Sequence, residues 1–501
     1  MNVADIVAAT AARLPDKAAL VFQDRPIPYA ALDERIERVA AGLCALGVKR
    51  GDRVGLIVHN IPQFVEAYFG IARAGGVTVP LNTTYTAEEV TFILADAEAR
   101  AVVIAEPFLG ALDRGALPAL DVVVVVGDTA PAGAITYERM LAHDGPAPKV
   151  DTVADDVACL VYTSGTTGKP KGAMLTHGNL MANLEQMGAV PVLAEAETDV
   201  VLLALPLFHI YALNAILGLT MQSGATAVLQ ERFDAVAALD AVERHRVTVL
   251  FGAPPMFIAW LNTPGVDARD LSSVRLAVSG AAALPGPVLE DFERRLKVTI
   301  WEGYGLTETA PGVTSTAMGS RAKPGSIGRP LPRAEVRLVD ERDEDVEEGD
   351  PGEIIVRGPN IFAGYWHQPE ATEAALRGGW FHTGDVAYAD DEGYLFIVDR
   401  KKDMINVSGF NVYPREVEEV LFRHPKIAEA AVIGIAHPYT GEAVKAIVVL
   451  KPGTAATEED VIEHCRHSLA RFKCPQVVEF ALELPHTQTG KVLKRALRPP
   501  V

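Results

Sequence analysis

The chain has 501 residues, of which 49% are hydrophobic and 22% are charged, and its formal net charge is −19. This composition predicts a globular protein with a large buried core, divided into about three domains or subdomains of roughly 150 residues each. The negative charge repels phosphate backbones, so we expect no binding to nucleic acid. No segment approaches the roughly 18 apolar residues of a membrane span, and the four cysteines form no CxxC pair. We therefore expect a cytoplasmic protein without integral membrane contact.

Strand and helix patterns alternate along most of the chain. Segments rich in β-branched residues that stop at a loop are typical of buried parallel strands. These segments are residues 52–58, 99–105, 121–127, 157–163, 247–252 and 274–280. Residues 62–75 and 234–245 instead carry apolar side chains at helical spacing. The alternation predicts an α/β fold whose ligands bind at the carboxyl ends of the strands.

After about residue 330 the predicted strands and helices become shorter. Residues 335–358 predict two strands joined by an acidic turn, and short strands and helices alternate from residue 401 onward. We expect a large N-terminal multi-subdomain α/β region at 1–400, followed by a small C-terminal α+β domain at 401–501. The charged segment 399–403 marks the boundary between them.

The most informative segment is YTSGTTGKPKG (162–172), directly after a predicted strand. Its glycines allow a tight turn close to a ligand, and its hydroxyls and lysines favour polyphosphate. It is not a Walker A loop, because Pro170 stands where that motif needs Ser or Thr. The residues we expect at the phosphates are Thr163, Ser164, Gly165, Thr166, Thr167, Gly168, Lys169 and Lys171.

This loop resembles the signature phosphate loop of the adenylate-forming superfamily, which includes acyl-CoA synthetases, adenylation domains of peptide synthetases and luciferases. Further motifs follow in the family's order across nearly the whole chain. They are SGAA from Ser279, GYGLTE from Gly303, WFHTGD from Trp380, DRKKD from Asp399 and TGK from Thr489. The resemblance implies ATP, Mg²⁺ and coenzyme A as cofactors or co-substrates, with ATP and the acid bound by the first domain and a mobile second domain.

The resemblance also gives roles to individual residues near the nucleotide. Tyr304 would lay its ring against adenine, with the small residues Gly280, Ala281 and Ala282 forming a flat path beside the base. Thr307 would contact the α-phosphate. Glu308 would bind Mg²⁺, which prefers hard carboxylate oxygens beside phosphates.

Five further roles lie near or beyond the domain boundary. Asp385 would accept hydrogen bonds from the ribose hydroxyls, and Arg400 would donate nearby. Lys491 would bridge the attacking carboxylate and the α-phosphate in the first half-reaction. Lys402 matches the family's hinge, and Gly409 would line the pantetheine tunnel after the small domain rotates.

The segment FHIYALN (208–214) is similar to the same segment of plant 4-coumarate–CoA ligases, in which the tyrosine lines the acid pocket. We expect Tyr211, Ala215, Pro311 and Gly312 to bind the acid, with His209 at the pocket entrance. Ala215 departs from the Ser that the plant enzymes often carry. The segment has no Asp nearby that could pair with the amino group of a substrate. This absence disfavours an amino-acid substrate.

The sequence thus predicts an ATP-dependent ligase that activates a fatty or aryl-propenoic acid as acyl-AMP and transfers the acyl group to coenzyme A, releasing AMP and pyrophosphate. Residues 399–414 resemble bacterial fatty-acyl-CoA synthetases, so the choice between the two acids stays open. An alternative is an adenylating enzyme that loads a carrier protein. A luciferase-like oxidase shares the motifs, and a non-catalytic scaffold would be expected to lose Lys491 or Glu308. The prediction allows for a homodimer.

Overall fold

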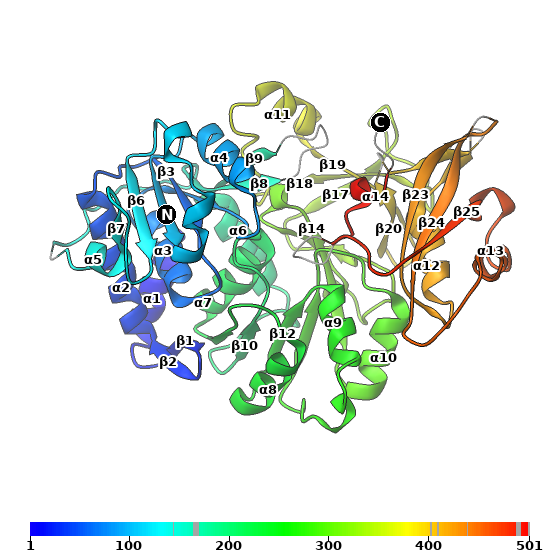
Figure 1. Ribbon diagram of the computed structural model, residues 1–501, viewed down its shortest axis with the longest axis horizontal. Coiled ribbons are helices and arrows are strands. Elements are labelled where there is room, and N and C mark those ends of the chain that lie inside the picture. The colour runs from blue at the N-terminus through cyan, green and yellow to red at the C-terminus, as the bar shows by residue number, and fades with distance from the viewer. Residues whose placement is uncertain are drawn as a thin grey trace.

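The computed structural model describes residues 1–143, 145–163, 170–400, 403–407, 410–437, 439–486 and 492–498, apart from the side chains of Asp399, Arg400, Asn411 and Arg495. Within these residues the strands form four sheets. Figure 1 shows the large N-terminal region in blue to yellow-green, with the smaller C-terminal sheet in orange at one side. This arrangement confirms the predicted mixed α/β fold with a small C-terminal α+β domain.

The first sheet joins seven strands of the described chain in the order β7-β6-β5-β3-β4-β8-β9. Its strand pairs are parallel except for β8 with β9. The sequence of β6 is five consecutive valines, as expected for a strand covered on both faces. The strands are β3 (Arg53–Ile57), β4 (Val77–Pro80), β5 (Ala101–Ala105), β6 (Val122–Val126), β7 (Ile135–Thr136), β8 (Val157–Thr163) and β9 (Lys171–Thr176).

The second sheet joins nine strands of the described chain in the order β16-β15-β14-β13-β12-β10-β11-β1-β2. Its strands β1, β11, β10, β12, β13 and β14 run parallel, so their carboxyl ends meet at one edge. The strands are β1 (Ala18–Phe22), β2 (Arg25–Pro28), β10 (Val200–Leu203), β11 (Thr226–Leu229), β12 (Val249–Gly252), β13 (Leu276–Ser279), β14 (Ile300–Gly305), β15 (Gly312–Ser315) and β16 (Arg329–Pro330). All six strands predicted within residues 52–280 are confirmed.

Helices pack around these two sheets. The predicted helices at 62–75 and 234–245 are confirmed as α3 and α8. Pro62 begins α3, at a position where a missing N–H leaves no hydrogen bond unmade. The helices are α1 (Asp5–Arg13), α2 (Tyr29–Ala45), α3 (Pro62–Arg73), α4 (Ala87–Asp96), α5 (Tyr137–Leu141), α6 (His177–Gly188), α7 (Leu219–Ser223), α8 (Ala235–His245), α9 (Pro254–Leu261), α10 (Gly286–Leu296) and α11 (Pro369–Ala375). No helix in the described part of the chain is long and apolar enough to cross a bilayer.

Two smaller sheets complete the molecule. The third is antiparallel and consists of β17 (Glu335–Val339), β18 (Gly352–Arg357), β19 (Phe381–Ala389) and β20 (Leu395–Arg400), which confirms the two strands predicted in 335–358. The fourth contains β21 (Ile405–Val407), β22 (Phe410–Val412), β23 (Ile427–His437), β24 (Gly441–Leu450) and β25 (Val477–Ala481). It is accompanied by α12 (Pro414–Phe422), α13 (Glu458–Arg466) and α14 (Lys494–Leu497).

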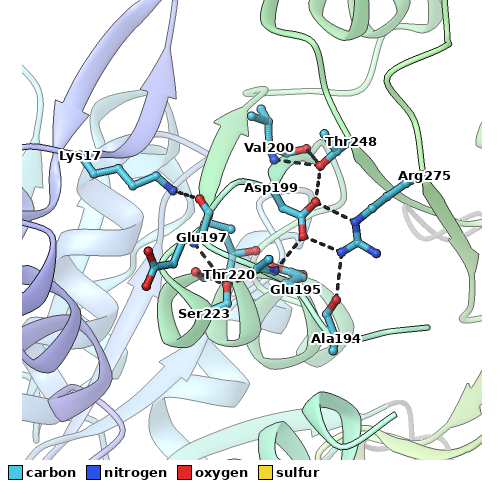
Figure 2. A network of polar contacts seen from close by, with 12 residues as sticks. Lys17, Ala194, Glu195, Glu197, Asp199, Val200, Thr220, Ser223, Thr248 and Arg275 are labelled. Atoms are coloured by element: carbon cyan, nitrogen blue, oxygen red, sulfur yellow. Dashed lines mark hydrogen bonds and ion pairs between the residues drawn. The ribbon is translucent and has the colours of Figure 1, made fainter. Parts of the chain in front are cut away.

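A polar cluster covers the amino ends of the second sheet's strands (Figure 2). Asp199, Thr248 and Arg275 directly precede β10, β12 and β13. Arg275 donates to both carboxylate oxygens of Asp199 at 2.8 and 2.5 Å, and Thr248 donates to the same carboxylate at 2.7 Å. Ser223 donates to the nearby Glu195 at 3.5 Å, and burial raises the pKa of Glu195 to about 8. The cluster thus stabilises the edge opposite the carboxyl ends, where ligands are expected.

Candidate active site

A cavity of about 850 Å³ lies where the carboxyl ends of β13 and β14 meet β8, β9 and the third sheet. In parallel sheets this is the edge at which ligands bind. The C-terminal segment reaches the same cavity, because His486 and Leu493 line it. The predicted site residues that line it are Thr163, Lys171, His209, Tyr211, Ala215, Gly280, Ala281, Tyr304, Thr307, Glu308, Pro311 and Gly312.

Some of the predicted site residues lie outside the described residues. They are Ser164, Gly165, Thr166, Thr167, Gly168, Lys169, Lys402, Gly409, Lys491 and the side chain of Arg400. The described neighbours of two of these segments do line the cavity. Thr163 and Lys171, the first and last of the predicted phosphate residues, are register partners in β8 and β9. His486 and Leu493 lie on either side of the segment that contains Lys491.

The predicted adenine and ribose residues lie in direct contact. The hydroxyl of Tyr304, on β14, donates to Asp385 Oδ2 at 2.7 Å, and Asp385 on β19 is buried. Ala281 follows β13 with a left-handed φ of 70°, which turns the chain sharply at the cavity wall. Ala282, the third residue of the predicted flat path, is not among the described residues that line the cavity.

Glu308 lies on a short 3₁₀ turn, η5 (Thr307–Thr309), and its carboxylate is held by Tyr365. The Tyr365 hydroxyl donates to Glu308 Oε1 at 2.8 Å, and Lys171 Nζ lies 5.2 Å from the centre of the Tyr365 ring. Burial and the charge of Glu308 raise the pKa of Tyr365, so its hydroxyl remains a donor. Residues 362–366 also pair with β9 on one side and donate to the Glu308 carbonyl on the other. The predicted phosphate loop and the predicted metal ligand are therefore connected through this segment.

Tyr211 forms part of an apolar wall of the cavity. It begins η3 (Tyr211–Gly218), a π-helix, a form that occurs frequently at functional sites. Its hydroxyl donates to the Val278 carbonyl at 3.2 Å, and its ring meets that of Phe251 edge-on with centroids 6.2 Å apart. The ring also lies against Gly280, where an added Cβ would be 3.0 Å from it. These contacts fix the orientation of the tyrosine ring in the cavity.

The other predicted acid-binding residues lie near this wall. His209 Nδ1 accepts a hydrogen bond from the Tyr211 backbone N–H at 3.3 Å, and Ala215 is buried on the same π-helix. Pro311 and Gly312 approach from the turn between β14 and β15. A Cβ on Gly312 would lie 3.0 Å from the Leu331 side chain, so glycine fits this position closely.

Several lining residues were not predicted from the sequence, among them Phe251, Val278 and Tyr365. Phe251 and Val278 occupy the last positions but one of the parallel strands β12 and β13. A position near the carboxyl end of a predicted parallel strand could have marked them as ligand-facing. Tyr365 follows β18 in an irregular segment. Only the folded chain brings it to Glu308.

Comparison with known protein families identifies the chain. The family described as AMP-binding enzyme matches residues 7–366, more than half of the sequence. The chain belongs to the AMP-binding enzyme family. The associated AMP-binding enzyme C-terminal domain matches residues 416–491, which include most of the fourth sheet.

Members of the AMP-binding enzyme family resemble this chain over nearly its whole length. A long-chain-fatty-acid–CoA ligase of Bacillus subtilis (strain 168) is 37% identical, covering 98% of this chain and 93% of that protein. A feruloyl-CoA synthase of Amycolatopsis sp is 42% identical, covering 94% and 93%. The crystal structure of the anthranilate CoA ligase AuaEII in complex with anthranoyl-AMP matches with a TM-score of 0.93 and 31% identity, covering 99% and 96%.

These relationships establish the class of reaction. The chain is an AMP-forming acyl-CoA ligase, an acid–thiol ligase whose substrates are a carboxylic acid, ATP and coenzyme A. Loading of a carrier protein, the alternative drawn from the sequence, is not favoured.

Proposed function

We propose that this acyl-CoA ligase activates an uncharged, apolar acyl or aryl-propenoic chain bearing one carboxylate. The proposal rests on a single cavity that is lined both by Tyr304, Thr307 and Glu308, three of the predicted nucleotide residues, and by the apolar wall of Tyr211, Phe251 and Val278. An apolar wall binds a hydrocarbon or aromatic body through the surface that it removes from water. The names of the fatty-acid and feruloyl relatives support the same range of acids.

In the first half-reaction the acid carboxylate attacks the α-phosphorus of ATP, and pyrophosphate leaves. We assign the β- and γ-phosphates to the loop between Thr163 and Lys171, and the α-phosphate to Thr307. Lys491 would place its ammonium between the attacking carboxylate and the α-phosphate, which stabilises the charge that develops there. The position of His486 and Leu493 at the cavity supports this assignment.

The adenosine would bind along the other side of the cavity. Tyr304 would stack on the adenine while its hydroxyl holds Asp385, and Asp385 would accept from the ribose hydroxyls beside Arg400. Gly280, Ala281 and Ala282 would form the opposing backbone path. The contact between Tyr304 and Asp385 supports a shared role at one nucleoside.

Glu308 is the proposed ligand for Mg²⁺. Its carboxylate lines the cavity, is 8% exposed and is oriented by the Tyr365 hydroxyl, so it offers the hard oxygen that this ion prefers. When bound, Mg²⁺ would neutralise part of the phosphate charge. Through its contacts with Glu308 and Lys171, Tyr365 would then hold the carboxylate in a fixed position relative to β9, the strand that follows the phosphate loop.

For the second half-reaction we propose a division of the chain into residues 1–400 and a mobile domain at 401–501, with the hinge at Lys402. After rotation, Gly409 would line a tunnel for pantetheine. The thiol loses its proton to solvent as its sulfur attacks the acyl carbonyl carbon. The bond between that carbon and the phosphate oxygen breaks, and AMP leaves with the bonding electrons. A homodimer and a cytoplasmic location remain predictions from the sequence.

A panel of acids tests this proposal. AMP formation is measured with cinnamic-type, benzoic, medium-chain and long-chain acids, each with and without coenzyme A. We expect turnover on apolar monocarboxylates only when coenzyme A is present. A preference for amino acids or dicarboxylates, or AMP release independent of coenzyme A, would contradict the proposal.

A further inference from the structure

One turn connects the two halves of the active site. Residues 305–312 leave β14 with Thr307 and Glu308, on the nucleotide side, and enter β15 with Pro311 and Gly312, on the acid side. A Cβ at Gly305 would lie 1.8 Å from the Pro311 carbonyl oxygen, so the two ends of the turn touch. Within it Ala310 has a left-handed φ of 63°, a conformation that L-residues adopt rarely and that the surrounding structure must maintain.

Four buried carboxamides surround this turn: Asn183, Gln186, Asn214 and Asn360, each 0 or 1% exposed. Asn183 pairs with the backbone of Gly312, donating to its carbonyl at 2.9 Å and accepting from its N–H at 3.1 Å. Asn214 donates to the Ala310 carbonyl at 2.8 Å. We call this set the carboxamide cluster.

Asn360 extends the carboxamide cluster to the nucleotide side of the turn. It donates to the Thr309 carbonyl at 2.8 Å and to the Gly312 carbonyl at 3.0 Å. Gln186 joins the cluster internally, accepting from Asn183 at 3.1 Å and donating to Asn360 at 3.2 Å. The backbone of residues 309, 310 and 312 is therefore hydrogen-bonded from three separate elements of the fold.

We propose that Asn183, Gln186, Asn214 and Asn360 are positioning residues for acyl-adenylate formation. They hold the 305–312 turn in the geometry in which Thr307 and Glu308 face the same space as Pro311 and Gly312. A carboxamide suits this task because it donates and accepts without burying a charge. The inference rests on the proposed function, since it assigns the two ends of the turn to ATP and to the acid.

The consequence is that a single substitution outside the cavity should affect both substrates. Asn183→Leu keeps the branched shape of the side chain, with a larger volume, and removes both hydrogen bonds to Gly312. Displacing catalytic groups by about 1 Å can lower a rate by about 100-fold. We therefore expect pyrophosphate exchange to fall by about 10- to 100-fold, with KM rising for ATP and for the acid together.

Two further variants separate positioning from general stability. Gln186→Met is close to isosteric and leaves the contacts of Asn183 and Asn360 with the turn intact, so it should cause a smaller defect of the same kind. Asn179→Ala is the matched control: Asn179 lies one turn earlier on α6, caps that helix and donates to the Pro359 carbonyl at 2.9 Å. It should lower the melting temperature and leave both KM values within about twofold.

Equilibrium binding of ATP provides a readout that is independent of the acid. We expect ATP affinity to fall at least about fivefold in Asn183→Leu and to stay unchanged in Asn179→Ala. If the wild type activates none of the acids tested, the proposed function fails. The ATP-binding measurement still decides whether the carboxamide cluster positions the turn. If Asn183→Leu and Gln186→Met melt earlier but keep wild-type ATP affinity and KM values, the cluster is structural and the inference is overturned. If Asn183→Leu does not fold, unchanged constants in Gln186→Met lead to the same conclusion.

Discussion

At the scale of single residues, Tyr365 orients the carboxylate proposed to bind Mg²⁺. Tyr365→Phe keeps the ring near Lys171 and removes the hydroxyl that donates to Glu308 Oε1 at 2.8 Å. Loss of such an outer partner typically lowers metal affinity by about 10- to 100-fold. We expect the Mg²⁺ concentration for half-maximal adenylation to rise by about tenfold or more, measured by titrating Mg²⁺ in pyrophosphate exchange.

A buried tyrosine elsewhere in the fold supplies the control for this change. The hydroxyl of Tyr394 donates to the Arg321 carbonyl at 3.1 Å, and the side chain does not line the cavity in the described structure. Tyr394→Phe should cost stability of about 1 kcal/mol and leave the Mg²⁺ requirement unchanged. An equal change of the Mg²⁺ requirement in both variants would remove Tyr365 from the proposed metal site.

Tyr211 should determine which acids enter. Tyr211→Ala opens the wall shared with Phe251, so we expect wider or longer acids to be accepted. The ratio of kcat/KM between acids should change by about 1–3 kcal/mol, the usual scale for reshaping an apolar pocket. Tyr211→Phe keeps the ring against Gly280, loses the hydrogen bond to Val278 and should retain the wild-type ranking. A defect in KM for ATP with an unchanged ranking of acids would place Tyr211 outside the acid pocket.

At the scale of elements, the amino ends of β10, β12 and β13 carry a pH-dependent contribution to stability. Burial, reinforced by the charge of Asp199, raises the pKa of Glu195 from 4.5 to about 8. The folded state therefore favours the protonated acid. This stabilisation is complete below pH 4.5 and is lost as the pH rises through 8.

Glu195→Gln removes that ionisation. We expect the variant to melt at a higher temperature than the wild type at pH 9, with the difference shrinking towards pH 6, because each pKa unit corresponds to about 1.4 kcal/mol. Glu197→Gln alters a neighbouring exposed carboxylate that pairs with Arg13, and its effect should not vary over this pH range. The same difference in melting temperature at both pH values for Glu195→Gln would contradict the assignment.

Six strands of the two large sheets, the pair β17 and β18, and the helices α3 and α8 could be predicted because their signals are local. The valine run of β6 and the apolar spacing of α3 each lie within a short window of sequence. The π-helix at Tyr211–Gly218 could not be predicted in this way, since its composition is almost wholly apolar and indicates no period. The motif residues that line the cavity were found through resemblance to a family.

The supporting residues of the site could not be predicted from local patterns at all. Asn183, Asn214 and Asn360 come from three separate elements, and a single buried Asn has no sequence signature. Tyr365 is separated from Glu308 by the whole of β15 to β18. Their roles depend on tertiary contacts, which local propensity does not encode.

At the scale of the whole molecule, the proposed mechanism requires two arrangements of the chain. Lys402 lies outside the described residues, between β20, which ends at Arg400, and β21, which begins at Ile405. Proline there fixes φ near −65° and should restrict rotation of the small domain. We expect Lys402→Pro to keep acyl-adenylate formation within about tenfold of wild type while thioester formation falls much further.

Lys491→Ala supplies the opposite case for comparison. It should reduce adenylation by about 100-fold or more, while thioester formation from supplied acyl-AMP survives. Pyrophosphate exchange and single-turnover thioester formation, measured on both variants, give the two half-reactions separately. Intact thioester formation in Lys402→Pro would contradict the two-arrangement mechanism.

The 305–312 turn also bears on how such an enzyme can be redesigned. Because the turn carries nucleotide residues at one end and acid residues at the other, libraries that randomise Pro311 or Gly312 should lose ATP turnover together with the native acid preference. Leu193 and Phe251 line the same cavity from segments that contain none of the proposed nucleotide residues. Evolution or engineering can therefore change the acid from that side, and variants there should retain the adenylation step while the range of substrates broadens.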